Sequence, residues 1–348
     1  MNVQSREQFP DLIKGVAIIL VVAGHCIQSG CGIRYSAGNA YWENYLFKFI
    51  YGFHMPLFAM VSGYLFYHSI NKRNLLRIIY QRVLSIGIPI ITWCSIMLVV
   101  RYREEAFDGV ISFLLYFRIV MGSSLWFLWA LLGCSFLIIG IRFFLRDSLI
   151  VYIAFLIISP FITDAHYIGA VKFLYPFFLF GYLINKYKVC NVMRVEFWEH
   201  KKFMLMMLIV IYTLILFVFH YDTYFYTSGI TIFGKEDIYY QLWNDVVRLI
   251  AGFAGCLAVI GSMALLMRGG RMCLRAVDTL AMVGQYTMGI YIVNWQTLPI
   301  LSRITRDMSY GVGLVISETI IVTIVCLVIS MILYRVKVVS GLLFGKWN

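Results

Sequence analysis

The sequence predicts an all-α integral membrane protein, a polytopic bundle of about ten transmembrane helices with both termini in the cytoplasm. Of its 348 residues, 61% are hydrophobic and only 13% are charged, and the mean hydropathy is +0.83. A soluble globular protein has roughly 45–50% apolar and about 25% charged residues. Several apolar runs also exceed the roughly 18 residues that mark a helix spanning a bilayer. These observations exclude a disordered chain and a soluble enzyme.

The predicted spans are the long apolar runs of the chain. No separating segment has the composition of a soluble domain, so residues 1–348 are predicted to form a single membrane domain. The first run is not predicted to be a cleavable signal peptide, because only Arg6 precedes it and no small-residue cleavage site follows. The ten spans are residues 10–30, 46–67, 83–100, 124–145, 148–163, 168–185, 203–220, 245–266, 280–302 and 311–334.

Lysine and arginine are distributed unevenly between the segments that join the spans. With the N-terminus inside, 18 of the 29 basic residues lie in inner segments, 7 lie in outer segments and 4 lie within spans. Because cytoplasmic loops carry the excess of Lys and Arg, both termini are predicted to be cytoplasmic. The net charge of +12 therefore reflects topology, and no nucleic-acid partner is predicted.

The eight cysteines have neither the spacing of a disulfide framework nor that of a metal site. Most of them lie within spans or in inner loops, where thiols stay reduced. Cys26 and Cys31 are the pair near the outer face, so a bridge between them is the one disulfide to consider. No metal cofactor is expected.

The first span contains ionisable residues, which are costly inside a membrane and mark a candidate functional site. Lys14 and His25 are eleven residues apart, so on a helix they share one face at a separation of about 16 Å. Asp11 precedes Lys14 by three positions and is predicted to pair with it. The alternative to a functional site is that the lysine snorkels to the membrane surface and the histidine packs in the core. Because the two side chains share one face, a functional site is favoured.

Other spans place polar residues at a similar depth. His54 lies in the second span, where its alternative role is to satisfy backbone groups freed by Pro56. Arg248 lies one turn from Asp245, a carboxylate that would neutralise it. Together these residues predict a polar cavity in the outer half of the membrane. The set consists of His25, His54, Lys172, Arg248, Asn294 and Glu318.

Two segments outside the spans have a composition that suggests binding. Residues 68–82 carry Lys72, Arg73, Arg77 and Arg82, which suit a phosphate-bearing ligand but also serve as a topology signal. Residues 221–244, like residues 101–123, are predicted to form an outer loop. The aromatic residues of 221–244 form either an interfacial belt or a stacking surface for sugar rings.

Several stretches resemble the acyltransferase-3 family of integral membrane acyltransferases, in particular its fucose 4-O-acetylase-like branch. The first span has that family's basic residue, ten intervening residues and histidine. The stretches together extend over most of the chain. They are residues 11–25 (DLIKGVAIILVVAGH), 53–58 (FHMPLF) with 62–64 (SGY), 88–89 (IP) after the basic stretch, 124–128 (SLWFL) and 284–291 (GQYTMGIY).

The resemblance implies transfer of an acetyl group from cytoplasmic acetyl-CoA to a hydroxyl of an extracytoplasmic O-antigen, capsule or exopolysaccharide sugar. It implies a multi-pass protein of the bacterial inner membrane, with acyl-CoA, a carbohydrate or lipid-linked glycan, and membrane lipids as partners. One position departs from the pattern of this branch. The branch commonly has histidine where this sequence has Asn294, and asparagine cannot act as an acid or base. The additional esterase-like domain of some members is not expected, because only a short basic tail follows residue 334.

Under this interpretation His25 is the general base or a transient acyl carrier. Lys14 engages the donor, and Arg77 and Arg82 bind its phosphates. His54 and Asn294 position the acceptor or stabilise the oxyanion, and Trp126 is either a sugar platform or a belt residue. The residues predicted to bind substrate are Asp11, Trp126, Arg248, Asn294 and Glu318.

A transporter or flippase for a lipid-linked sugar is the competing function, because it also needs a polar cavity inside the membrane. That class predicts inverted repeats and helices broken by Gly or Pro at matching positions. The chain has six prolines and no such symmetry, which favours the acyltransferase.

Overall fold

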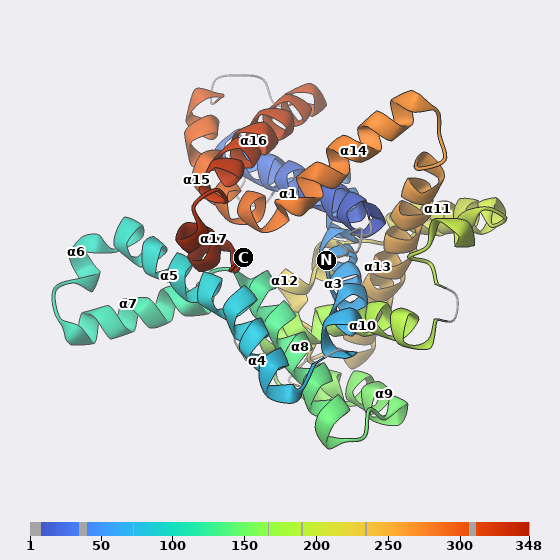
Figure 1. Ribbon diagram of the computed structural model, residues 1–348, viewed down its shortest axis with the longest axis horizontal. Helices are drawn as coiled ribbons and strands as arrows, with labels where there is room; N and C mark the ends of the chain where they lie inside the picture. Colours follow the sequence, from blue (N-terminus) through green and yellow to red (C-terminus); the bar gives the residue numbers. More distant parts are fainter. Residues whose placement is uncertain are drawn as a thin grey trace, which may run out of the picture.

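The computed structural model describes residues 8–34, 40–71, 73–165, 167–188, 191–233, 235–305 and 311–347 (Figure 1). These residues form helices joined by short connections, and none of them is in a strand. The predicted all-α membrane class is therefore confirmed. Seven described helices are long and apolar enough to cross a membrane, and three shorter apolar helices accompany them.

The helices follow one another along the chain with short 3₁₀ segments and one π-helical segment between them. In order they are α1 (Gln8–Arg34), η1 (Ala40–Glu43), α2 (Tyr45–Tyr51), α3 (His54–Asn71), α4 (Leu75–Arg82), η2 (Val83–Gly87), α5 (Ile88–Arg101), α6 (Arg103–Ala106), α7 (Val110–Ser123), α8 (Trp126–Phe144), α9 (Leu149–Ile158), η3 (Ser159–Phe161), α10 (Ile168–Tyr187), η4 (Val195–Trp198), α11 (Lys202–Ile215), η5 (Tyr221–Thr223), α12 (Phe225–Ser228), α13 (Ile238–Leu266), α14 (Arg271–Gln285), α15 (Thr287–Ile304), α16 (Val312–Leu333) and α17 (Lys337–Phe344).

Several sequence-based boundaries are wrong, among them the start of α13, which begins at Ile238 inside the predicted loop 221–244. Residues 101–123 are not a loop, because α6 and α7 occupy them and α7 packs beside α5 at one edge of the molecule (Figure 1). Fourteen residues are too few for a regular span, yet the apolar run is ample for a helix packed on its neighbour. The predicted span 280–302 is divided at Tyr286 into α14 and α15.

Proline explains two further irregularities. Pro56 has no N–H to donate to the Gly52 carbonyl, and the chain leaves helical geometry between α2 and α3. The Tyr212 hydroxyl donates to the nearby Phe49 carbonyl, which completes the end of α2. Similarly, the π-helical segment η2 ends at Gly87, two residues before Pro89. Both irregularities border the cavities described below.

Glycines allow two helix pairs to approach with their backbones in contact. A Cβ atom on Gly63 of α3 would meet the Phe178 carbonyl of α10, and one on Gly181 would meet the Met60 carbonyl. The same reciprocal contact joins α1 and α14 through Gly15 and Gly284. Small residues at such positions are what close packing between membrane helices requires.

We expect Gly63→Ala to destabilise the protein by about 1–3 kcal/mol, because the added methyl group overpacks a backbone contact. Gly140→Ala is the matched control, since the space around this α8 glycine is open and alanine favours a helix. Thermal unfolding of the two purified variants measures the difference. Equal melting temperatures would contradict the close contact.

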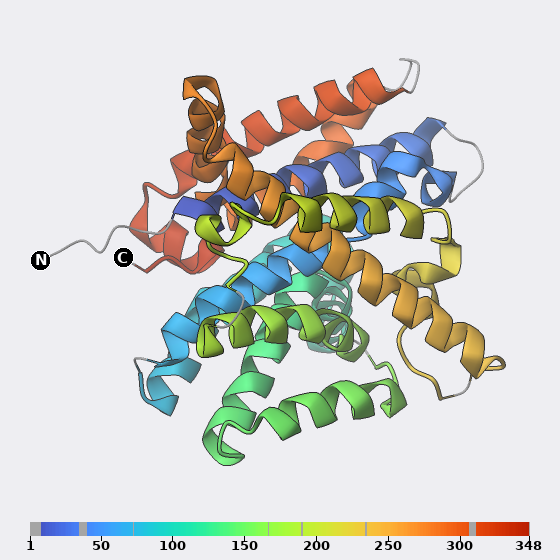
Figure 2. The same ribbon diagram turned by 90° about the vertical axis from the view of Figure 1, so that its right-hand side faces the viewer.

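The long helices cross the molecule in roughly one direction, and α1 begins at the same end at which α17 lies (Figure 2). Cys26 of α1 is a free, buried cysteine, and the side chain of Cys31 lies outside the described part of the chain. The Lys14–Asp11 pair predicted from the helical spacing is confirmed, with 2.6 Å between Nζ and Oδ1. The cytoplasmic location of both termini stays a prediction.

Candidate active site

One face of α1 lines two adjoining cavities. Lys14, Ile18 and Val21 border a cavity of about 160 Å³, which we call the lysine cavity. Val21 and His25 border a second cavity of about 300 Å³, the histidine cavity. Spacings of three and four residues place these side chains in one stripe. The expectation that Lys14 and His25 share a face is therefore confirmed.

The histidine cavity is lined largely by aromatic residues. Trp126 lies at its wall beside Tyr226, with the ring centroids 5.4 Å apart and nearly perpendicular. Trp295 packs against the His25 ring at 4.6 Å. The walls thus combine flat apolar faces with two imidazoles, a composition that suits a sugar ring bearing hydroxyl groups. The lining residues are Val21, His25, Gln28, Trp42, Tyr51, His54, Met55, Ser123, Trp126, Tyr226, Tyr291 and Trp295.

Asn294 holds the imidazole of His25 in a defined orientation. Asn294 Nδ2 donates to the carbonyls of Ile290 at 2.9 Å and Tyr291 at 2.5 Å. Its Oδ1 atom therefore faces His25 Nδ1, which is 2.7 Å away. An amide oxygen only accepts, so Nδ1 of a neutral His25 carries the proton and Nε2 keeps a lone pair. This is the tautomer that a general base needs.

His54 is the first residue of α3 and is held in a similar way. Its Nδ1 atom lies 2.9 Å from the Ile50 carbonyl, across the break between α2 and α3. The carbonyl can only accept, so a neutral His54 also keeps its lone pair on Nε2. His54 thus contacts a backbone carbonyl close to Pro56 and also lines the histidine cavity. Its role in catalysis stays a prediction.

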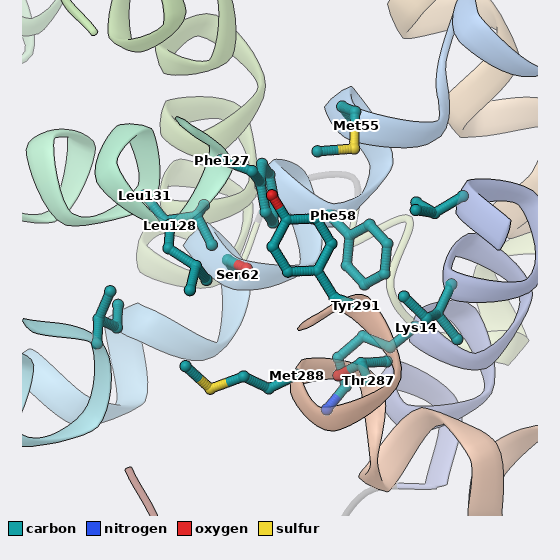
Figure 3. Close-up of a pocket in the computed structure, with 13 residues that line it drawn as sticks. Lys14, Met55, Phe58, Ser62, Phe127, Leu128, Leu131, Thr287, Met288 and Tyr291 are labelled. Atoms are coloured by element: carbon teal, nitrogen blue, oxygen red, sulfur yellow. The ribbon is translucent and has the colours of Figure 1, made fainter. Parts of the chain in front are cut away.

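The lysine cavity is mainly apolar and has a few polar groups at its wall (Figure 3). Lys14 enters it from α1, Ser62 from α3 and Thr287 from α15. Val21, Met55 and Tyr291 border both the lysine cavity and the histidine cavity, so the two adjoin. A ligand in the lysine cavity would therefore lie next to the two imidazoles.

A third cavity, the arginine cavity, occupies about 490 Å³ beside α4 and η2. Arg73, Arg77 and Arg82 line it, and the Arg82 guanidinium lies 4.2 Å over the Phe66 ring. Lys72 lies outside the described residues. Leu84 and Ser85 of η2 face this cavity, while the next residue, Ile86, faces the lysine cavity. The arginine cavity thus lies on the other side of η2 from the lysine cavity, which in turn adjoins the histidine cavity.

Arg248 lines a smaller cavity beside the histidine cavity, and the two cavities share Tyr51, Met55 and Tyr226. Its guanidinium donates to the carbonyls of Thr223, Gly229 and Asp222, to Ser228 Oγ and to Asp245 Oδ1. The predicted pairing with Asp245 is confirmed, at 2.7 Å. Arg248 therefore holds residues 222–229, the segment that carries Tyr226 to the histidine cavity. A direct contact with substrate stays a prediction.

Lys172 is buried and pairs with Asp164 at 2.6 Å instead of facing a cavity. Burial disfavours the charge of Asp164, but Lys172 and the N–H groups of Ile230 and Thr231 hold the pKa of this carboxyl below its ordinary value. This pair thus secures the other end of the segment held by Arg248.

Glu318 also lies away from the three cavities. It is buried in α16, where Oε1 accepts a hydrogen bond of 2.6 Å from Thr305 Oγ1 at the end of α15. The contact joins α16 to the end of α15. The role of Glu318 in binding substrate stays a prediction, and so does that of Asp11, which contacts Lys14.

Among the lining residues that were not predicted site residues are Gln28, Trp42, Tyr51 and Trp295. Gln28 lies one turn after His25 on the same face of α1, a signal that the helical spacing offered. The three aromatic residues gave no local signal, because an aromatic residue near a span end is usually part of an interfacial belt. Tyr226 belongs to the outer segment for which a sugar surface was one alternative.

Trp126 is placed by an unusual backbone conformation. Leu125, which precedes it, has φ 55° and ψ 34° in the left-handed region, which is rare for a bulky residue. The Tyr167 hydroxyl lies 2.6 Å from the Met121 carbonyl and 2.9 Å from that of Ser124. These contacts support the sharp turn between α7 and α8, which directs Ser123 and Trp126 to the histidine cavity.

The comparison with protein families agrees with the motifs. The family model for the acyltransferase domain matches residues 7–335. The chain belongs to the acyltransferase-3 family. It is therefore an acyltransferase, and its apolar helices make it a multi-pass membrane protein. No solved structure matches this acyltransferase significantly.

Two relatives of this acyltransferase carry the name nodulation protein NolL. The protein of Sinorhizobium fredii (strain NBRC 101917 / NGR234) is 28% identical over 291 residues, which cover 82% of this chain and 76% of the relative. That of Mesorhizobium japonicum (strain LMG 29417 / CECT 9101 / MAFF 303099) is 25% identical over 298 residues, which cover 82% and 74%.

Proposed function

We propose that this acyltransferase transfers an acetyl group from cytoplasmic acetyl-CoA to a hydroxyl of an extracytoplasmic surface polysaccharide. The observation that carries the proposal is the series of three cavities, which leads from Arg77 and Arg82 past Lys14 to His25. A donor and an acceptor on opposite sides of a membrane need neighbouring binding sites, and the arginine and lysine cavities are bordered by the consecutive residues Ser85 and Ile86. Under this proposal the protein lies in a bacterial inner membrane, and both of its termini are in the cytoplasm.

The donor occupies the arginine and lysine cavities. Guanidinium groups bind phosphate through charge-assisted hydrogen bonds, so Arg77 and Arg82 suit the phosphates of CoA. The apolar walls of the lysine cavity suit the pantetheine arm, whose amides Lys14, Ser62 and Thr287 would contact. The thioester would then lie near the wall that the lysine and histidine cavities share.

The acceptor occupies the histidine cavity. His25 Nε2 takes the proton of the acceptor hydroxyl as its oxygen attacks the thioester carbonyl. The carbon–sulfur bond then breaks, and the CoA thiolate leaves with the proton that His25 had taken. His54 Nε2 accepts a hydrogen bond from a second hydroxyl of the sugar, which favours positioning of the acceptor over stabilisation of the oxyanion.

The aromatic walls support a carbohydrate acceptor, free or lipid-linked. Trp126, Tyr226 and Trp295 offer flat faces around the two imidazoles. Arg248 contributes by holding the segment that carries Tyr226. These features support a sugar as the class of acceptor, of which O-antigen, capsule and exopolysaccharide sugars are examples.

Transfer of radiolabel from acetyl-CoA to surface glycan in membranes that contain the protein tests the proposal. Label should appear in the glycan fraction and disappear when His25 is replaced by alanine. A flippase would instead move lipid-linked sugar across the membrane without transferring label. Absence of label with every surface glycan of the host would contradict the acetyl-CoA donor.

We expect Arg77→Ala and Arg82→Ala each to raise the KM for acetyl-CoA about tenfold, in keeping with the roughly 1.5–3 kcal/mol of a hydrogen bond to a charged group. The kcat should change little, because neither guanidinium reaches the reacting atoms. Arg271→Ala is the control, because this exposed arginine starts α14 outside the arginine cavity. An unchanged KM in both variants would leave these residues as topology signals only.

A further inference from the structure

The C-terminal tail after α17 packs against the π-helical segment η2. The Ile88 N–H bonds to the Val83 carbonyl, and Pro89 has no N–H. The helix therefore does not supply its usual donor to the Leu84 carbonyl. Trp347 Nε1 supplies it instead, at 3.1 Å. The edge of the indole is thus held by a backbone group that the proline has freed.

Two glycines make this approach possible. Gly345 has φ +66°, a conformation that favours glycine, and a Cβ atom there would collide with the backbone of Ser85 in η2. A Cβ atom on Gly341 of α17 would lie 2.6 Å from the Trp347 ring. The tail therefore turns tightly against η2, and the Trp347 ring lies over α17.

The rest of the tail is secured on its other side. Lys346 Nζ lies 3.3 Å from the Gln285 carbonyl at the end of α14 and 4.2 Å over the Tyr334 ring. At the end of α17, the Leu343 carbonyl accepts a 2.9 Å hydrogen bond from Trp93 Nε1 of α5. The tail is therefore a fixed part of the fold, connecting the start of α5 with the junction of α14 and α15.

Fixed in this way, the tail forms one wall of the arginine cavity. Gly345 and Trp347 line that cavity with Arg73, Arg77 and Arg82. Trp347 remains 45% exposed although its Nε1 edge is bonded. A flat aromatic surface beside guanidinium groups matches the chemistry of a nucleotide, because a base stacks on the ring while phosphates meet the cations.

We propose that Trp347 is the platform on which the adenine of the acyl donor stacks, while the three arginines bind its phosphates. This inference rests on the proposed acyl-CoA donor and adds its nucleotide subsite. Residue 347 lies beyond the residues 7–335 that the family model matches. A wall of the donor site is therefore contributed by a segment outside the matched domain.

The decisive experiment compares ligands that contain the nucleotide with one that lacks it. Purified wild-type, Trp347→Ala, Trp347→Phe and Trp243→Ala proteins are titrated with CoA and with 4′-phosphopantetheine by calorimetry. We expect Trp347→Ala to weaken CoA about tenfold, within the range for base–aromatic stacking, and to leave 4′-phosphopantetheine unchanged. Trp347→Phe should retain most of the CoA affinity, and Trp243→Ala, an exposed tryptophan outside the cavity, should retain all of it.

Equal CoA affinity in wild-type and Trp347→Ala would overturn the inference, and so would an equal loss for both ligands, which would indicate a structural role. A wild-type protein that binds neither ligand would instead contradict the proposed donor. The titration is repeated in nanodiscs with and without phosphatidylglycerol. An arginine cavity that serves a lipid headgroup would show competition by that lipid and no effect of Trp347→Ala on CoA, which also overturns the inference.

Discussion

Replacing His25 by alanine is expected to lower the rate of acyl transfer by about 10²–10⁴-fold, the usual contribution of a general acid–base group. The physical reason is the geometry of the site. His25 faces the histidine cavity from α1, and its contact with Asn294 leaves Nε2 as the atom with the lone pair. Labelled acetyl transfer to glycan, with equal amounts of protein in the membrane, measures the effect.

His68→Ala serves as the matched control. His68 lies on the exposed part of α3, where its ring is near Tyr64 and Tyr67 and outside all three cavities. Its replacement should leave the rate within about twofold of wild type, as expected for a surface substitution. Full activity in His25→Ala, with the protein inserted and folded, would remove His25 from the reaction.

An experiment with the wild-type protein distinguishes a general base from an acyl carrier. A carrier would form an acetyl-imidazole when labelled acetyl-CoA is added without acceptor, and label would remain on the protein after a rapid quench. A general base needs the acceptor present and leaves no label on the protein. We expect no label, because the sites proposed for the acceptor and the thioester lie in adjoining cavities on either side of the same wall.

Replacing Asn294 by leucine is expected to lower kcat by about 10–100-fold and to leave the KM for acetyl-CoA nearly unchanged. Leucine has a similar volume but cannot accept the proton of His25 Nδ1, so the imidazole loses both its tautomer and its orientation. Asn294→Asp should retain more activity, because a carboxylate oxygen still accepts that hydrogen bond. Asn294 is therefore a positioning residue.

Thr297→Val is the control for this series. Thr297 lies one turn further along α15, where its hydroxyl contacts the carbonyls of Val293 and Asn294 and the Cys326 thiol. Its replacement disturbs α15 without touching His25. Similar losses in Thr297→Val and Asn294→Leu, or a rise in KM instead of a fall in kcat, would argue that Asn294 only stabilises the helix.

The part of the site that lies on one helix could be predicted from the sequence. Lys14 and His25 are related by the helical repeat, and Asp11 is one turn from Lys14, so local geometry places all three. The same reasoning gave the pair of Arg248 and Asp245. The membrane class followed from composition, because the length and hydropathy of each span reflect the thickness of the bilayer.

Contacts between distant segments could not be predicted in this way. Asn294 was noted as a departure from a histidine, but its contact with His25 joins residues 269 positions apart. Arg248 and Glu318 were predicted to face one polar cavity with the histidines because burying an ionisable group is costly, but neither lines the histidine cavity. In the fold, each offsets that cost through protein partners: backbone and Asp245 for Arg248, and Thr305 for Glu318.

Hydropathy thus specifies the class of protein, because the length of an apolar span reflects the thickness of the bilayer. Helical periodicity specifies the stripe of side chains on α1, because it depends only on the spacing of residues along the chain. Helix packing decides the remainder. Close glycine contacts bring α3 to α10 and α1 to α14, and the proline-induced break and π segment direct His54 to one cavity and Trp347 to another. Such contacts form between complementary surfaces that meet only in the folded protein. No local sequence pattern therefore predicts them.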